Sequence, residues 1–245
     1  MAGAGRVLHF VADSVRVAVR LPGSGGATAL PLERFFSPAD NAAIEAAVRD
    51  VEARSAGEIV PYAVERSDRY TRAVWTAATL GGLAGALAAA ILRWAGDFWG
   101  GHVALWIALP PATGAAIGWL LALALPGLRR LLVPPGVLAE RVYQRASEAF
   151  LAEEVFRTRD RTGILIFLSL FERRVVVRAD RGLDGVVTAG EWAEIVDSIA
   201  TGMREGRPGP ALAEGIRRCA SLAGRVPPRP DDRDELPGQL RMRRE

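Results

Sequence analysis

Two long stretches without a charged residue divide this chain. Val74 to Leu92 is a run of 19 uncharged residues, and Val103 to Leu128 is a run of 26. A helix needs about 20 mostly apolar residues to cross a hydrocarbon core of roughly 30 Å. We therefore predict a transmembrane helical hairpin at residues 73–130. The alternative is a pair of buried core helices in a soluble protein, but these would need long amphipathic partner helices that the sequence does not provide.

Arginines flank the predicted hairpin on its two outer sides. They are Arg66, Arg69 and Arg72 before it and Arg129 and Arg130 after it. The connection between the two stretches carries only Arg93 and His102 as basic residues. Basic flanking segments stay on the cytoplasmic side of a membrane. We therefore predict a multi-pass protein of the inner (plasma) membrane whose N-terminal and C-terminal parts are both cytoplasmic.

The basic residues also exclude some classes of function. All 31 are arginine, so neither a P-loop lysine nor a Schiff-base lysine is available. The net charge is only +3 and the arginines are spread along the chain, which predicts no nucleic-acid partner. The two histidines, His9 and His102, lie outside the main domain predicted below, which argues against a histidine base or a histidine-rich metal site there.

The single cysteine, Cys219, has Arg225 six residues after it. This is the Cys-x5-Arg spacing with which some phosphatases hold a phosphate against a thiolate. That chemistry needs the thiol in a loop at a helix N-terminus, where its pKa is lowered. Cys219 instead falls late in a predicted helix, so we interpret it as a packed structural thiol.

Three segments read as the strands of a soluble domain. Gly163 to Leu170 is a continuous apolar run of strand length, as expected for a strand covered on both faces. Arg174 to Asp180 follows after a short charged turn and contains three consecutive valines. Glu58 to Glu65 is the third strand, and Pro61 within it predicts an edge position or a bulge.

Helical periodicity marks four further segments, at about residues 38–55, 138–156, 190–205 and 212–223. Ser37 and Pro38 are a suitable cap and first residue for the earliest of these helices. Short alternating pieces in residues 1–34 allow an additional hairpin in this N-terminal extension. The tail at 226–245 is rich in proline and charge, which predicts an extended or disordered segment unless something binds it.

The order of these elements predicts one α/β domain interrupted by the membrane hairpin. Residues 35–72 are its first part and residues 131–225 its second. The strands at 58–65 and 163–170 should be parallel and linked through the helix at 138–156, with the strand at 174–180 antiparallel to its neighbour.

This topology has a consequence for the charged residues at the two ends of the sheet. Arg173 and Arg174 join the flanking arginines in a basic collar at the membrane end; the collar is Arg66, Arg69, Arg72, Arg129, Arg130, Arg173 and Arg174. Four acidic residues, Glu58, Asp160, Asp180 and Asp184, meet at the opposite end. Carboxylates converging from several loops can bind Ca²⁺ or Mg²⁺. The alternative is that nearby arginines pair with these acids on a solvated surface.

Several segments together resemble the TPM domain family, in its bacterial membrane branch with a two-span hairpin inserted in the domain. They are Phe36-Ser37-Pro38-Ala39-Asp40, Ser55-Ala56-Gly57-Glu58-Ile59, RTRDRTGILI at 157–166, ERRV at 172–175, DRGL at 180–183, Trp192, and DELP at 234–237. The resemblance covers residues 34–237. It implies an αβα sandwich with a mixed sheet. It also implies the activities associated with the family, which are acid-phosphatase-like activity, divalent-cation binding and maintenance of membrane protein complexes.

One departure from the family pattern concerns the predicted cation site. Many soluble members carry an acidic residue shortly after the turn that corresponds to Gly182 to Gly185, whereas this chain has Thr188 and Ala189. Because the sequence shows no complete catalytic set and carries a full membrane anchor, we predict an interaction or assembly module for membrane protein complexes, which binds a membrane or cytoplasmic protein partner. The alternative is a divalent-cation-dependent phosphatase.

Overall fold

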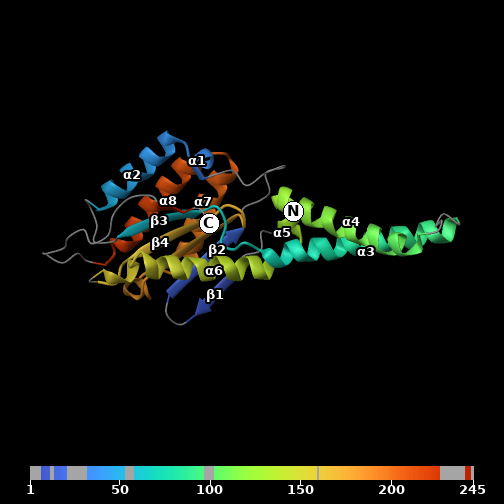
Figure 1. Ribbon diagram of the computed structural model, residues 1–245. Coiled ribbons are helices and arrows are strands. Elements are labelled where there is room, and N and C mark those ends of the chain that lie inside the picture. The colour runs from blue at the N-terminus through green and yellow to red at the C-terminus, as the bar shows by residue number, and fades with distance from the viewer. Residues whose placement is uncertain are drawn as a thin grey trace. The chain divides into compact units, whose positions relative to one another are not determined.

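The computed structural model describes residues 7–11, 14–20, 32–52, 58–96, 102–158, 160–226 and 241–243. The chain forms two compact units, which are described separately (Figure 1). The first, here called the α/β domain, contains Met1–Gly25, Ala29–Ser67 and Leu138–Glu245; the second, here called the helical hairpin, contains Gly26–Thr28 and Asp68–Val137. Three parts of the family-like segments, residues 55–57, 159 and 234–237, lie outside the described residues.

A six-stranded mixed sheet forms the centre of the α/β domain, in the order β1-β2-β5-β4-β3-β6. The strands are β1 (Val7–Val11), β2 (Ser14–Arg20), β3 (Ile59–Val64), β4 (Ile164–Ser169), β5 (Arg174–Ala179) and β6 (Arg241–Arg243). The predicted pairing is confirmed, because β3 is parallel to β4 and β5 is antiparallel to β4. The additional N-terminal hairpin is also present, and its strand β2 pairs with β5.

The position of Pro61 corrects the expectation of a simple edge strand. β3 lies between β4 and β6, but β6 pairs only with Tyr62, Ala63 and Val64. The carbonyls of Glu58 and Val64 accept hydrogen bonds from the β4 side. Because backbone groups alternate along a strand, those of Pro61 point the other way, beside the start of the β6 pairing. Proline is tolerated there because no ladder bond to β4 is lost.

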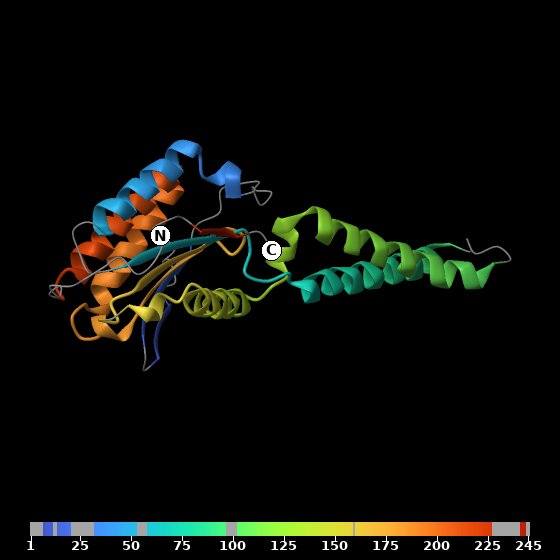
Figure 2. The same cartoon turned by 60° about the vertical axis from the view of Figure 1, so that its left-hand side comes forward.

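Helices cover both faces of the sheet, which confirms the αβα arrangement (Figure 2). One face carries α1 (Leu32–Phe35), α2 (Pro38–Glu52), α7 (Ala189–Arg204) and α8 (Pro208–Ala223), and the other carries α6 (Pro135–Ala152). The Ser37 hydroxyl accepts a hydrogen bond from the Asp40 amide at 3.1 Å, so the predicted cap of α2 is present. Two short 3-10 turns, η1 (Val155–Arg157) and η2 (Arg181–Leu183), flank β4 and β5.

The side chains of β4 alternate between two buried faces of the sheet, which explains the uninterrupted apolar sequence of this strand. Ile164, Ile166 and Leu168 pack in the core beneath α2, α7 and α8, whereas Leu165 and Phe167 pack in the core beneath α6. Every residue of β4 is buried. A strand covered on both faces has no position at which a charged side chain can reach water.

The helical hairpin consists of α3 (Thr71–Ala95), α4 (Val103–Ala124) and the short α5 (Pro126–Leu131). Glycines allow α3 and α4 to approach closely, because a Cβ atom on Gly81 would lie 2.2 Å from the carbonyl oxygen of Gly114. A Cβ on Gly118 would likewise lie 2.2 Å from the carbonyl oxygen of Ala77. Small residues four apart therefore form the contact between the two helices.

Both long helices have the length and hydropathy needed to cross a membrane. Only 22% of the most apolar window of α3 and 6% of that of α4 is buried. Large apolar side chains such as Leu83, Leu87 and Ile107 are more than 60% exposed. The core helix of a soluble protein would instead be mostly buried.

Candidate functional site

The sheet end opposite the β4–β5 turn brings together three of the predicted acidic positions. The Ile164 amide donates to the Glu58 carbonyl at 2.8 Å, and the Asp180 amide donates to the Gly163 carbonyl at 2.9 Å. Glu58 therefore directly precedes β3 and lies beside the start of β4 and the end of β5. Both Glu58 and Asp180 are buried.

The loop before β4 folds against the turn after β5. The Gly182 amide donates to the Arg161 carbonyl at 2.9 Å, and Arg161 has a left-handed backbone with φ of 57°. A Cβ atom on Gly182 would lie 2.2 Å from the Asp160 carbonyl oxygen. Glycine at this position therefore allows the close approach that brings the Asp160 backbone next to the Asp180 turn.

The Asp180 carboxylate is held by local contacts. Its Oδ1 accepts a hydrogen bond from the Arg181 amide at 2.9 Å, and its Oδ2 lies 3.4 Å from Nη1 of Arg161. The same Arg161 nitrogen donates to the carbonyl of Phe156 at 2.8 Å. Asp180 thus takes the arginine-paired arrangement given above as the alternative to cation binding.

A pocket of about 320 Å³ opens beside this ion pair and is lined by Leu151, Phe156, Arg161, Asp180 and Arg181. Leu151 and Phe156 give it an apolar part, and Arg161, Asp180 and Arg181 give it a charged part. An anion bearing an apolar group suits this combination better than a bare cation does.

Within the described part of the chain, no group of three or more His, Cys, Asp or Glu side chains is arranged to hold a metal ion. Asp184 is exposed on the turn that follows η2. Binding of Ca²⁺ or Mg²⁺ by Glu58, Asp160, Asp180 and Asp184 stays a prediction that titration must test.

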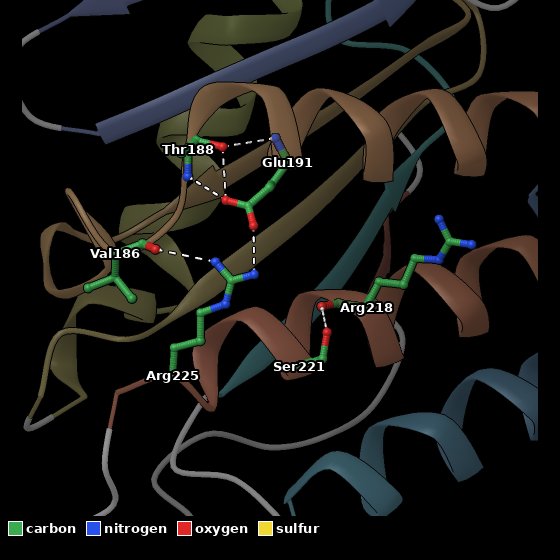
Figure 3. Close-up of polar contacts among 6 residues, drawn as sticks. All are labelled: Val186, Thr188, Glu191, Arg218, Ser221 and Arg225. Carbon is green, nitrogen blue, oxygen red and sulfur yellow. Dashed lines mark hydrogen bonds and ion pairs between the residues drawn. The ribbon is translucent and has the colours of Figure 1, made fainter.

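Thr188, which marks the departure from the family pattern, caps α7 (Figure 3). Its hydroxyl accepts from the Glu191 amide, and the Glu191 carboxylate accepts from the Thr188 amide at 2.8 Å. Arg225 donates to the other oxygen of Glu191 at 2.6 Å and to the Val186 carbonyl at 3.4 Å. The hydrogen bond from Arg225 is the largest of the contacts that hold the pKa of Glu191 down, from 4.5 to about 2.

Cys219 is fully buried within α8. Removal from water raises the pKa of its thiol, because burial penalises the charged thiolate. Arg225 contacts Glu191 and Val186. These observations confirm the interpretation of Cys219 as a structural thiol.

The opposite end of the sheet contains a buried carboxylate, that of Glu172 in the β4–β5 turn. It accepts a hydrogen bond from the Ser67 amide at 2.9 Å and contacts the Ser169 hydroxyl. Arg66, Arg173 and Arg174 lie at this same end, as the register requires. The remaining collar arginines belong to the helical hairpin, so the collar as a whole stays a prediction.

A family comparison identifies this part of the chain. Residues 137–222 match the family model of the TPM domain. These residues are similar to the TPM domain. The match runs from α6 to α8 and so includes β4, β5 and both loops around Asp180. It confirms the resemblance inferred from the sequence motifs.

A solved structure supports the fold of the TPM region. The NMR structure of BA42 protein from the psychrophilic bacterium Bizionia argentinensis matches with a TM-score of 0.52, at 18% sequence identity. The match covers 86% of this chain and 97% of that one. At this identity the likeness concerns the fold alone. No curated protein sequence matches the chain.

Two arrangements around the TPM region are not foreseen by the sequence motifs. One is the contact of Arg225 with Glu191, which lie 34 residues apart. The other is the return of the tail as β6, where Arg241 and Arg243 both approach Glu153. Neither pair has a local sequence signal, because each forms only when distant segments meet in the folded domain.

Proposed function

We propose that this protein is a membrane-anchored module whose TPM domain binds a partner protein and helps assemble a complex at the cytoplasmic face of the inner (plasma) membrane. The observation that carries the proposal is the place of the helical hairpin in the chain. β3 leads into α3, and α6 returns the chain to β4, the strand next to β3. A domain tethered at two adjacent core strands is held at the membrane by both ends of the insertion.

The exposed apolar surface of α3 and α4 supports the anchoring part of the proposal. Side chains such as Leu87 and Ile107 would each gain about 1.5–3 kcal/mol on moving from water into hydrocarbon. Alkaline washing of isolated membranes should leave the full chain in the pellet. Recovery of most of the chain in the wash would contradict anchoring by these helices.

The assembly role assigns no catalytic duty to Asp180 or Glu191. Both carboxylates are paired with arginines that connect separate segments of the domain, so they act in folding. Affinity capture of the tagged full chain from mild detergent extracts should recover a specific partner protein. Repeated capture that returns no protein above an untagged control would contradict the assembly role.

The same proposal assigns the basic collar to the inner leaflet. Each collar arginine near an anionic surface contributes up to about 1 kcal/mol. Salt screens this attraction over roughly 8–10 Å. The collar would hold the domain upright, with Arg173 towards the lipid headgroups and Asp184 towards the cytoplasm.

Cysteine labelling tests this orientation. Single cysteines replace Gly96, Arg173 or Asp184 in a Cys219→Ala background. The cysteine at position 96 should react in intact cells, and the one at position 184 only after permeabilisation. Lipid-borne quenchers should reach a probe at position 173 far better than one at 184. Equal quenching at the two positions would exclude the collar.

A divalent-cation-dependent phosphatase is the second candidate, favoured by the pocket that places Arg161 and Arg181 beside Asp180. Arginines at such a position suit a phosphate ester. The purified chain should then hydrolyse a generic phosphate ester only with added Ca²⁺ or Mg²⁺, and either ion should raise its melting temperature. Activity that is unchanged in Asp180→Ala with Asp184→Ala would exclude this assignment.

A further inference from the structure

The C-terminal tail returns to the sheet and covers the outer edge of β3. β6 runs parallel to β3, with Arg241 opposite Tyr62, Met242 opposite Ala63 and Arg243 opposite Val64. Without β6, β3 would be the edge strand on this side of the described sheet. An uncovered edge strand offers unpaired backbone groups to any extended segment that approaches it.

The carboxylate of Glu153 contacts both arginines of β6. The Nη1 atom of Arg241 lies 3.1 Å from Oε2 of Glu153, and Nη2 of Arg243 lies 3.7 Å from Oε1. The side chain of Glu153 is only 9% exposed, compared with 63% for that of Arg243. Residues two apart in a strand share a face, so both arginines lie on the α6 side of the sheet.

The position of Glu153, at the C-terminal end of α6, favours the binding of cations. It directly follows Ala152, the last residue of α6, and its amide donates to the Ala149 carbonyl at 2.9 Å. The C-terminal end of a helix carries partial negative charge and disfavours an anion. Burial of a carboxylate there is a further penalty unless cations approach it. The guanidinium groups of Arg241 and Arg243 supply positive charge that offsets both of these unfavourable effects.

Only part of the β3 backbone can form hydrogen bonds at this edge. Alternation along the strand turns the N–H and C=O of Ala63 towards β6, whereas Pro61 has no N–H to offer on that side. The Ala63 amide is therefore a specific reporter of whether β6 is in place.

From these contacts we infer that the β3 edge with Glu153 is a strand-addition site for an extended basic segment of a partner protein, with arginines two residues apart. The chain's own Arg241–Arg243 occupies the site as a displaceable strap. The inference rests on the proposed function and names the chemistry of its partner. Main-chain bonds to Ala63 supply affinity, and the Glu153 carboxylate selects the basic residues.

Competition between the strap and a partner follows from their connection to the chain. β6 and β3 belong to the same chain, and tethering within one chain gives a segment an effective concentration on the order of 1 mM. The concentration of a partner segment of equal affinity must exceed this effective concentration before the partner can occupy the site. Otherwise the strap must first be released. The strap thus excludes weak, non-specific strand pairing.

The test uses the full chain in detergent micelles. Arg241→Glu with Arg243→Glu places like charges beside Glu153 and releases the strap. Arg204→Glu with Arg217→Glu makes the same charge change on exposed positions of α7 and α8, on the opposite face of the sheet. Hydrogen exchange at residues 59–64 should accelerate in the first variant only.

Peptide binding gives a second readout. The probe is a fluorescent peptide of residues 237–245, PGQLRMRRE, compared with its charge-reversed form PGQLEMERE. The released variant should bind the first peptide at least about tenfold more tightly than the wild type does, because the tethered competitor is gone. The second peptide should not bind. Glu153→Arg added to the released variant should restore slow exchange at residues 59–64.

Three outcomes would overturn the inference. They are exchange at residues 59–64 that is equal in the released variant and the wild type, equal binding of the two peptides, and a dimer in which the tail of one copy occupies the site of another. The last outcome would assign the site to a second copy of this chain. Failure to recover a partner protein from membranes would contradict the proposed function but would leave the exchange and peptide results unchanged.

Discussion

The guanidinium of Arg225, which follows α8, lies 2.6 Å from the carboxylate of Glu191 in the first turn of α7. Glu191 also completes the capping box with Thr188. The Glu191 carboxylate therefore accepts a hydrogen bond from the backbone at the start of α7 and also connects α7 to the end of α8. The pKa of Glu191 falls from 4.5 to about 2, chiefly because of its hydrogen bond with Arg225.

This contact predicts an acid-sensitive contribution to stability. A carboxylate whose pKa is lower in the folded state stabilises the fold above its unfolded pKa and loses that effect as the pH falls towards the folded value. The contribution of Glu191 should be complete above pH 4.5 and disappear between pH 4.5 and 2. Glu191→Gln should therefore flatten the fall of melting temperature over that interval, whereas Glu194→Gln on the same helix should not. Parallel curves for the two variants would contradict this role of Glu191.

Adjacent glycines in α3 should respond differently to the same substitution. Gly81→Ala places a Cβ 2.2 Å from the Gly114 carbonyl oxygen, so α3 and α4 must move apart. The nearest atoms to a Cβ on Gly82 lie 3.5 Å away, at ordinary contact distance. Denaturation in mixed micelles should show a loss of about 1–3 kcal/mol for Gly81→Ala. Gly82→Ala should show little loss; equal losses would mean that the helices do not pack through Gly81.

The turn beside Asp180 offers a similar comparison. Gly182→Ala should lower the free energy of unfolding by about 1–3 kcal/mol, because its Cβ would meet the carbonyl oxygens of Asp160 and Arg161. The atom nearest to a Cβ added at Gly190 lies 3.9 Å away. Gly190 is in the first turn of α7, where alanine is favourable, so Gly190→Ala should not destabilise the domain. Chemical denaturation of the two variants measures the difference. A stable Gly182→Ala chain would show that this turn tolerates rearrangement.

Cys219 should be unreactive while the protein is folded. It is fully buried, and burial raises its pKa, so almost no thiolate is present or accessible at neutral pH. Iodoacetamide should label the native chain at pH 8 only as fast as the domain unfolds. Addition of denaturant should give complete labelling. Rapid labelling under native conditions would reopen the catalytic interpretation of this thiol.

Local patterns in the sequence determined the elements of this fold and the pairing of its central strands. An uninterrupted apolar run identified β4, because a strand buried on both faces admits no charged residue. The chain order then fixed β3 as parallel and β5 as antiparallel to β4. Uncharged runs of sufficient length identified α3 and α4.

The partners of the charged side chains were decided only by the tertiary structure. The sequence brought Glu58, Asp160 and Asp180 to one end of the sheet, but the pairing of Asp180 with Arg161 forms only where the loop before β4 meets the turn after β5. The tail was predicted as extended unless bound, and nothing local indicated that β3 and Glu153 would bind it. Hydrophobic periodicity is a local property of a segment, whereas ion pairs between residues 34 or 88 positions apart exist only after the segments that carry them have packed.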